Sequence, residues 1–254
     1  MSFSGWKFGL CSLTHAGKSR QPEVSMQGQS GENPFNSLPP VVVALVAVIF
    51  GIEVVLDLSR SGLIGGTRGG ADWRIFAIQD YAFSAEIFQW MMETSRWPPE
   101  HLRRFVTYLF IHGSFTHMVM VCVFVLALGK MVGETFRQWT VLVIFLAAGV
   151  AGALAYGLLL ETGQPLYGGY PGAYGLIGAF TFILWVGYGR AGQNQLQAFR
   201  LIGFLMAIQL VFGLIFGANK DWVAELAGFA TGFVLSVVLQ PGGWSALLRT
   251  MRQR

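Results

Sequence analysis

One carboxylate stands in an otherwise apolar segment near the end of the chain. Glu225 is the only ionisable residue within residues 222–239. A charge inside a membrane segment is costly, so such a residue is a functional candidate by default. Gly228 and Gly232 follow it by three and seven positions, and these spacings place all three on one helical face. The pattern indicates a face that packs closely on another helix and carries one carboxyl group.

Two histidines and one tyrosine are the other residues that could do chemistry. His112 and His117 lie five positions apart in the apolar segment 105–132, and they point in different directions if this segment is one helix. Because no cysteine or carboxylate cluster accompanies them, the spacing is poor for a shared metal ion, and neither a metal nor a cofactor is predicted. Each histidine could equally be a hydrogen-bonded core residue. Tyr174 lies where a glycine-rich loop becomes an apolar helix.

The elements that position these residues are predicted to cross a membrane. Hydrophobic residues make up 54% of the 254-residue chain and charged residues 12%, whereas a soluble domain has about a quarter charged residues. The composition indicates an all-α polytopic membrane protein. The net charge of +4 is ordinary for this class and does not indicate a nucleic-acid partner. The six expected spans are residues 41–56, 105–132, 139–160, 172–186, 201–216 and 222–239.

The fourth of these spans is predicted to be short and central. Residues 172–186 give roughly 22 Å of helix, whereas the core of a bilayer is about 30 Å thick. The end of such a helix could not face lipid, because its free backbone N–H groups need partners. We therefore expect other helices to surround it, with Gly175 and Gly178 where a neighbour comes closest.

The remaining chain divides into two tails and one long loop. We expect residues 1–38 to form a flexible cytoplasmic tail, residues 39–240 the membrane domain, and residues 241–254 a basic cytoplasmic tail. The long first loop, residues 59–102, mixes aromatic and charged side chains. This mixture is typical of an amphipathic element that lies at the membrane interface, and a small soluble subdomain is the alternative.

The positive charges predict how the chain is oriented. With six spans, both termini lie on one side, and that side collects ten Lys and Arg residues. Outside the long first loop and the Arg103-Arg104 pair next to it, only Lys220 lies on the other side. Cytoplasmic loops are enriched in Lys and Arg, so we expect both termini to be cytoplasmic, in a bacterial inner (plasma) membrane.

Three motifs resemble those of the rhomboid intramembrane serine proteases, and they occur in the same order. They are His112-x-x-x-x-His117 in the second span, Gly-Ala-Tyr174-Gly175 in the fourth, and Ala-Glu225-x-x-Gly228-x-x-x-Gly in the sixth. The pair Trp73-Arg74 could match a Trp-Arg pair in that family's first loop. The resemblance covers roughly residues 41–240, and it implies the six-helix rhomboid-like bundle with an interfacial first loop.

The departures from the family's pattern fall on its catalytic positions. The resemblance places Tyr174 at the nucleophilic serine, Glu225 at the general-base histidine, and Val121 at the asparagine that binds the oxyanion. A nucleophile needs a base within hydrogen-bond reach, and an oxyanion needs preorganised donors. A phenol, with an ordinary pKa near 10, is a poor substitute for an activated serine. We therefore expect no protease activity, although His112 and His117 are retained.

The resemblance to inactive members of the family implies a pseudoprotease. Such a protein would bind transmembrane helices of client or partner proteins within the lipid bilayer without cleaving them. The predicted cleft residues are His112, His117, Tyr174, Gly175, Glu225 and Gly228. Because the resemblance places Tyr174 and Glu225 at two touching positions, we expect a hydrogen bond between them, with Glu225 either protonated or surrounded by donors.

Three other functions remain open from the sequence. The chain could be a fixed structural subunit of a larger membrane complex. It could be an active protease that uses displaced residues, such as Ser114 near His117. Finally, Glu225, His112 and His117 could form part of a proton or ion path, although three ionisable groups are thin support for one.

Overall fold

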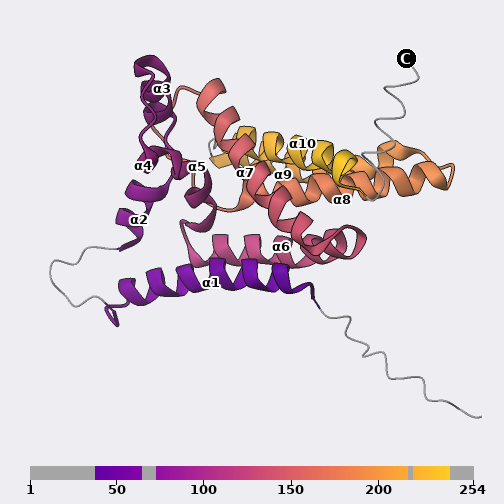
Figure 1. Ribbon diagram of the computed structural model, residues 1–254, viewed down its shortest axis with the longest axis horizontal. Coiled ribbons are helices and arrows are strands. Elements are labelled where there is room, and N and C mark those ends of the chain that lie inside the picture. Colours follow the sequence, from indigo (N-terminus) through magenta and orange to yellow (C-terminus); the bar gives the residue numbers. More distant parts are fainter. Residues whose placement is uncertain (1–37, 65–72, 217–219, 241–254) are drawn as a thin grey trace, which may run out of the picture. The chain divides into compact units, whose positions relative to one another are not determined.

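The computed structural model describes residues 38–64, 73–216 and 220–240. The expected N-terminal tail and C-terminal tail therefore lie outside the described residues, apart from Leu38. The regular structure of the described residues is helical, and one isolated antiparallel bridge joins Phe83 to Leu166. The α-helices are α1 Pro40–Arg60, α2 Trp73–Tyr81, α3 Ala85–Thr94, α4 Pro99–Leu102, α5 Arg104–Thr107, α6 Phe115–Thr135, α7 Gln138–Leu159, α8 Tyr170–Arg190, α9 Arg200–Phe216 and α10 Trp222–Leu239 (Figure 1).

Five of these helices are long and apolar enough to cross a membrane. They are α1, α6, α7, α8 and α10, and they confirm the prediction of a polytopic helical bundle. The remaining expected span is α9, whose 17 residues correspond to roughly 25 Å of helix. The number of six crossings therefore stays a prediction.

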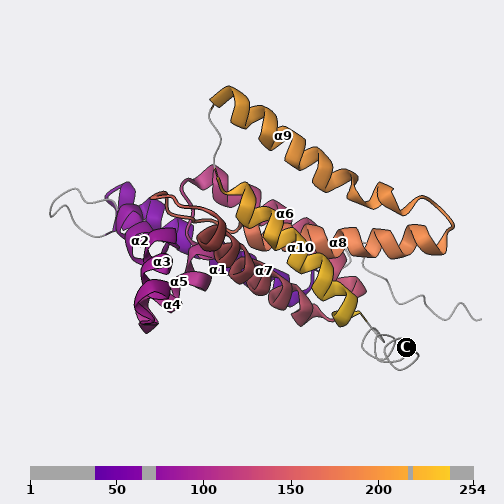
Figure 2. The same cartoon turned by 90° about the horizontal axis from the view of Figure 1, so that it is seen from above.

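The fourth expected span is central, as predicted, but it is not short. Helix α8 contains 21 residues, or roughly 31 Å, which is enough to cross a bilayer core. It begins with Pro171 in its first turn, where a missing N–H is tolerated, and it continues through Gly187 and Gly189 to Arg190. Helices α6, α7 and α10 pack against it, and α8 and α10 run side by side (Figure 2).

The second expected span, residues 105–132, is interrupted, and the prediction of one continuous helix was wrong. Helix α5 and the 3-10 turn Tyr108–Phe110 come first, and α6 begins only at Phe115. The Ser114 side chain accepts a hydrogen bond from the His117 N–H at 3.2 Å and thereby caps the new helix. His112 consequently lies outside α6, in a segment where Ile111 has extended backbone angles.

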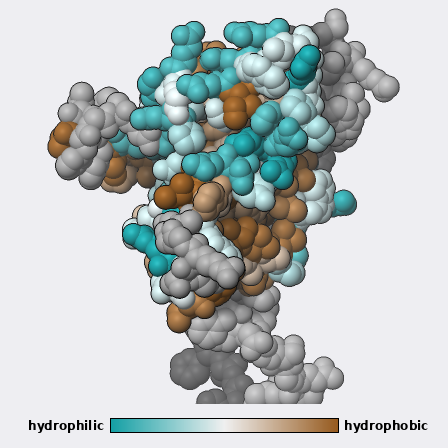
Figure 3. Space-filling model, turned by 90° about the vertical axis from the view of Figure 1, so that its left-hand side faces the viewer, coloured by the Kyte–Doolittle hydropathy of each residue, from teal (hydrophilic) through white to brown (hydrophobic). Residues whose placement is uncertain are grey.

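The first loop is largely helical in its described part. The Ser84 side chain caps α3 at Ile87 N, and α3 packs on α7. Several apolar side chains of this loop are exposed, including Trp73, Phe76 and Trp90. On the face shown in Figure 3, hydrophilic and hydrophobic residues gather in separate regions. An interfacial position for the loop is compatible with this surface and stays a prediction, as does the soluble alternative.

Glycines bring the backbones of α8 and α10 into direct contact, which confirms the predicted close packing. A Cβ atom at Gly228 would lie closer than 3.0 Å to the carbonyl oxygen of Pro171, and one at Gly232 equally close to that of Gly175. A Cβ atom at Gly178 would meet the carbonyl oxygen of Phe229 in the same way. These contacts fix the distance between the helices that carry Tyr174 and Glu225.

Candidate functional site

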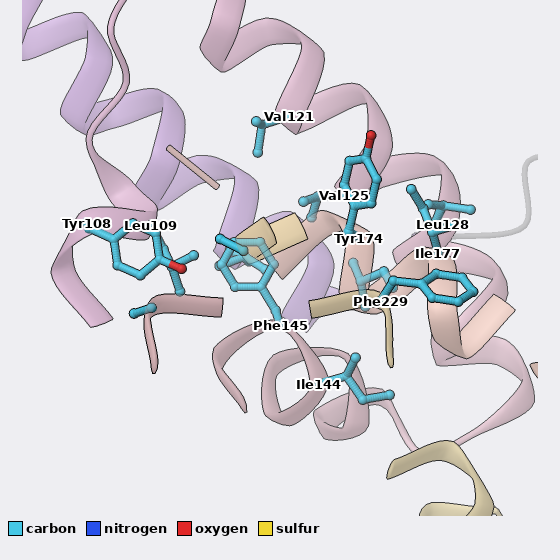
Figure 4. Close-up of a cluster of buried hydrophobic side chains, with 14 of the residues drawn as sticks. Tyr108, Leu109, Val121, Val125, Leu128, Ile144, Phe145, Tyr174, Ile177 and Phe229 are labelled. Carbon is cyan, nitrogen blue, oxygen red and sulfur yellow. The ribbon is translucent and has the colours of Figure 1, made fainter. Parts of the chain in front are cut away.

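Tyr174 and Glu225 face one another from α8 and α10, and both side chains are buried. Figure 4 shows the Tyr174 ring beside Val125, Ile177 and Phe229, with its hydroxyl directed away from the apolar cluster. The hydroxyl lies close enough to the Glu225 carboxylate for the two groups to interact. The expected direct hydrogen bond between them is not among those within 3.5 Å that the described residues form. The predicted proximity is therefore present, and a direct hydrogen bond between the two groups stays a prediction.

The hydrogen bond to the Glu225 carboxylate comes instead from Gln209 of α9, whose side-chain amide donates it. Gln209 was not among the residues predicted from the sequence. A signal was available, because Gln209 is the only polar side chain within the apolar run of residues 201–216. A lone amide in such a helix needs a partner, since an unpaired polar group in an apolar environment is costly.

Removing the Gln209 amide is expected to destabilise the protein by about 1–3 kcal/mol, because the buried Glu225 carboxyl group loses its donor. In a Glu225→Leu background, the same Gln209→Leu substitution is expected to cost less, since contacting partners are energetically coupled. Thermal unfolding of the two single variants and the double variant in detergent measures this coupling. Additive effects would contradict the contact.

The two histidines lie together, contrary to the expectation that they point in different directions. Their ring centroids are 5.2 Å apart, with the ring planes 85° apart. The expectation assumed one helix, whereas the segment before α6 turns His112 back toward His117. Among the described residues, no group of three or more His, Cys, Asp or Glu side chains is placed to hold a metal ion.

The His112 ring is a neutral hydrogen-bond acceptor. Its Nε2 atom accepts a hydrogen bond from the Gly169 N–H at 3.3 Å. Burial, and secondarily the nearby His117, lowers the pKa of His112 to about 3. The imidazole therefore stays uncharged at neutral pH, and its Nε2 lone pair is used to hold the chain just before α8.

Tyr170 links the histidine pair to Tyr174, and sequence analysis missed it. The Tyr170 ring stacks on His117 with a centroid distance of 4.8 Å and an angle of 20°. The Tyr174 ring lies 6.5 Å further on, edge to face with Tyr170. Tyr170 and Tyr174 are one helical turn apart, which was the available signal. Together with His112, these aromatic rings form one row leading to Glu225.

The other predicted site residues serve the packing around this row. Gly175 meets Ala148 of α7, and Gly228 meets the backbone of α8 at Pro171. Val121, at the position that the resemblance assigns to an oxyanion donor, is fully buried against Gly169. Its side chain has no hydrogen-bond donor, so it cannot stabilise an oxyanion.

Arg74 ties the first loop to the segment that carries His112. Its guanidinium group binds the Glu53 carboxylate at 2.8 Å and the Asp57 carboxylate at 2.6 Å, both from α1. The same group donates a hydrogen bond to the carbonyl oxygen of His112. Glu53 is fully buried, so its carboxylate depends on this guanidinium group. The Arg74 side chain thereby connects α1 to the backbone at His112.

Comparison with known proteins places the chain in a family. Residues 99–242 match the Rhomboid domain, and this match covers more than half of the 254 residues. The chain therefore belongs to the rhomboid family, as its three motifs predicted. The match extends from α4 to α10 and thus includes every residue of the row as well as Gln209 and Glu225.

Three relatives share part of the chain. RHOMBOID-like protein 4 of Arabidopsis thaliana is 27% identical over 132 residues, which are 51% of this chain and 32% of that protein. Rhomboid-like protease 3 of Toxoplasma gondii is 25% identical over 134 residues, 53% of this chain and 50% of that protein. RHOMBOID-like protein 9, chloroplastic, of Arabidopsis thaliana is 31% identical over 146 residues, 55% of this chain and 32% of that protein. The chain thus spans half or less of the length of these relatives.

Proposed function

We propose that this rhomboid family member is a pseudoprotease that binds transmembrane helices of other membrane proteins without cleaving them. Its role would be in the assembly, stability or traffic of those proteins. The observation that carries the proposal is the pairing of Tyr174 with Glu225 across α8 and α10. These are the two positions at which the family resemblance implies the serine and the histidine.

The surrounding groups favour binding over hydrolysis. The Glu225 carboxylate is engaged by Gln209, and the Tyr174 ring belongs to the apolar core. Ser114, the alternative nucleophile, uses its hydroxyl oxygen to cap α6. Attack on a peptide bond needs a nucleophile, a base and oxyanion donors together. These contacts support the proposal that the set is incomplete in this protein.

The protein is expected to leave transmembrane reporter substrates intact and to resist labelling by a serine-directed fluorophosphonate. The physical reason is the absence of a serine beside a base at the Tyr174 position. Gel analysis of reporter cleavage and in-gel detection of the probe provide the measurements, with an active rhomboid protease run in parallel. Labelling that maps to Ser114 or another residue would establish the active-enzyme alternative.

Binding is tested by placing a photocrosslinking amino acid at Tyr170, whose side chain is only partly buried. Irradiation of native membranes is expected to capture a changing set of membrane proteins through their transmembrane helices. Incorporation at Lys130, which is also partly buried and lies in the last turns of α6, serves as the matched control. One stoichiometric partner under all conditions would favour the fixed structural subunit.

We also propose a bacterial inner membrane location with both termini in the cytoplasm. The support is the distribution of Lys and Arg residues along the sequence. Tags placed at residue 2 and after Arg254 are expected to be protected from protease added outside intact cells. Digestion of either tag, with an outer-loop tag as positive control, would reverse the assigned orientation.

A further inference from the structure

An apolar groove lies away from the Tyr174–Glu225 pair, between the first-loop helices and α7. Its volume is about 530 Å³, and all eight lining side chains are hydrophobic or aromatic. Phe88 and Phe105 form its floor, because both are buried. Met92, Trp97 and Leu102 form one rim and are exposed.

The second rim of the groove is the surface of a membrane span. Val150, Leu154 and Leu158 line the groove from α7, and they extend over roughly 12 Å of that helix. Leu154 is 38% exposed and Leu158 64% exposed. The groove is therefore continuous with the exposed apolar surface of α7, a helix long and apolar enough to cross a membrane.

Aromatic packing builds the groove into the fold. The Phe88 ring lies 5.8 Å from the Phe105 ring and 6.4 Å from the Trp97 ring, edge to face in both cases. Gly157 of α7 lets Phe88 approach, since a Cβ atom there would lie 2.6 Å from the Phe88 ring. The floor of the groove is thus packed against α7.

The side chains that line the groove are suited to binding a hydrocarbon chain. The indole N–H of Trp97 is the single hydrogen-bond donor among the lining side chains, and it lies at the rim. Tryptophan is enriched at the level of lipid headgroups, where one end of the ring is apolar and the other wet. We propose that the groove holds one acyl chain of a bilayer phospholipid, with Trp97 next to its headgroup region.

The lining separates this groove from the Tyr174–Glu225 pair, because none of the eight lining residues belongs to α8, α9 or α10. The lipid site therefore stands or falls independently of the pseudoprotease proposal.

The test uses the full chain purified in detergent with a phosphatidylethanolamine that carries a diazirine midway along one acyl chain. Free lipid is washed away before irradiation, and the crosslinked residues are mapped by peptide mass spectrometry. Labelling is expected to concentrate in residues 88–105 and 150–158. Even labelling of all exposed apolar helix surfaces, Leu142 included, would overturn the proposal.

A matched pair of variants separates the groove from the general lipid surface. Leu154→Trp fills the groove, whereas Leu142→Trp makes the same change at an equally exposed position of α7 outside it, both leucines being 38% exposed. The Leu154→Trp variant is expected to retain about tenfold less lipid probe than the wild type, because an overpacked side chain in the groove weakens binding by about that factor. The Leu142→Trp variant is expected to retain the wild-type amount. Equal retention by the two variants would overturn the proposal. If Leu154→Trp does not fold, the labelling map of the unmodified chain decides alone.

Discussion

Replacing Arg74 by alanine is expected to destabilise the protein by about 3–5 kcal/mol. The fully buried Glu53 carboxylate would lose its guanidinium partner, and an uncompensated charge in the interior is strongly unfavourable. The carbonyl group of His112 would lose a hydrogen bond in the same step. The effect should therefore reach the histidine pair as well as the first loop.

Thermal unfolding in detergent measures this loss. Lys130→Ala is the control, because Lys130 forms an exposed pair with Glu134 at 4.0 Å, and such pairs contribute about 0–1 kcal/mol. Adding Glu53→Gln to Arg74→Ala is expected to recover part of the stability, since the buried charge is then removed. An unfolding temperature for Arg74→Ala equal to that of the Lys130 variant would show that the ion pairs are not needed for the fold.

Substituting Gly232 with alanine is expected to cost about 3 kcal/mol, at the upper end of the range for overpacked positions. The new methyl group would lie closer than 3.0 Å to the backbone of Gly175 in α8. Backbone atoms cannot move aside as a flexible side chain can, so α8 and α10 would have to separate. That separation would also pull Tyr174 away from Glu225.

Gly51→Ala provides the matched control, because a Cβ atom at Gly51 in α1 has no neighbour within 4 Å. This variant is expected to gain about 0.5–1 kcal/mol from the better helix propensity of alanine. Unfolding temperatures of both variants, measured in the same detergent, should therefore shift in opposite directions. A harmless Gly232→Ala would mean that the two helices tolerate a wider spacing.

Hydrophobic composition was enough to predict most of the membrane bundle. The predicted span of residues 222–239 agrees with α10, and α7 differs from its prediction by one residue at each end. A long apolar run in a membrane has few alternatives to an α-helix, because each of its backbone polar groups needs a partner within the protein. The break before α6 was missed because Gly113 and Ser114 interrupt the run without making it polar.

The length of α8 was underestimated for a related reason. Glycine is a weak helix former, so residues 187–190 read as an end signal. In the structure, the helix continues through them. The helix propensity of single residues is a weak guide to where a helix ends. Here the contacts of α8 with its neighbouring helices outweigh the low propensity of the glycines.

The spacing of the motifs identified two residues of the candidate site, but it could not identify the residues that contact them. The resemblance singled out Tyr174 and Glu225, and these side chains do meet. Gln209 joins them from a different helix, and no pattern along the chain records which helices are neighbours. For the same reason, Arg74 could be noticed in the sequence while its partners Glu53 and Asp57 could not be assigned to it.

The bridge between Phe83 and Leu166 also constrains the order in which the chain can fold. Two backbone hydrogen bonds, of 3.0 and 2.8 Å, join these residues, and both side chains are buried. Everything between them, including α6 and α7, must be synthesised and inserted before the bridge can form. The first loop consequently leaves the ribosome early, but its packing is complete only once residues 160–169, between α7 and α8, are also in place. Loop closure over so long a stretch makes this pairing a late event in biogenesis.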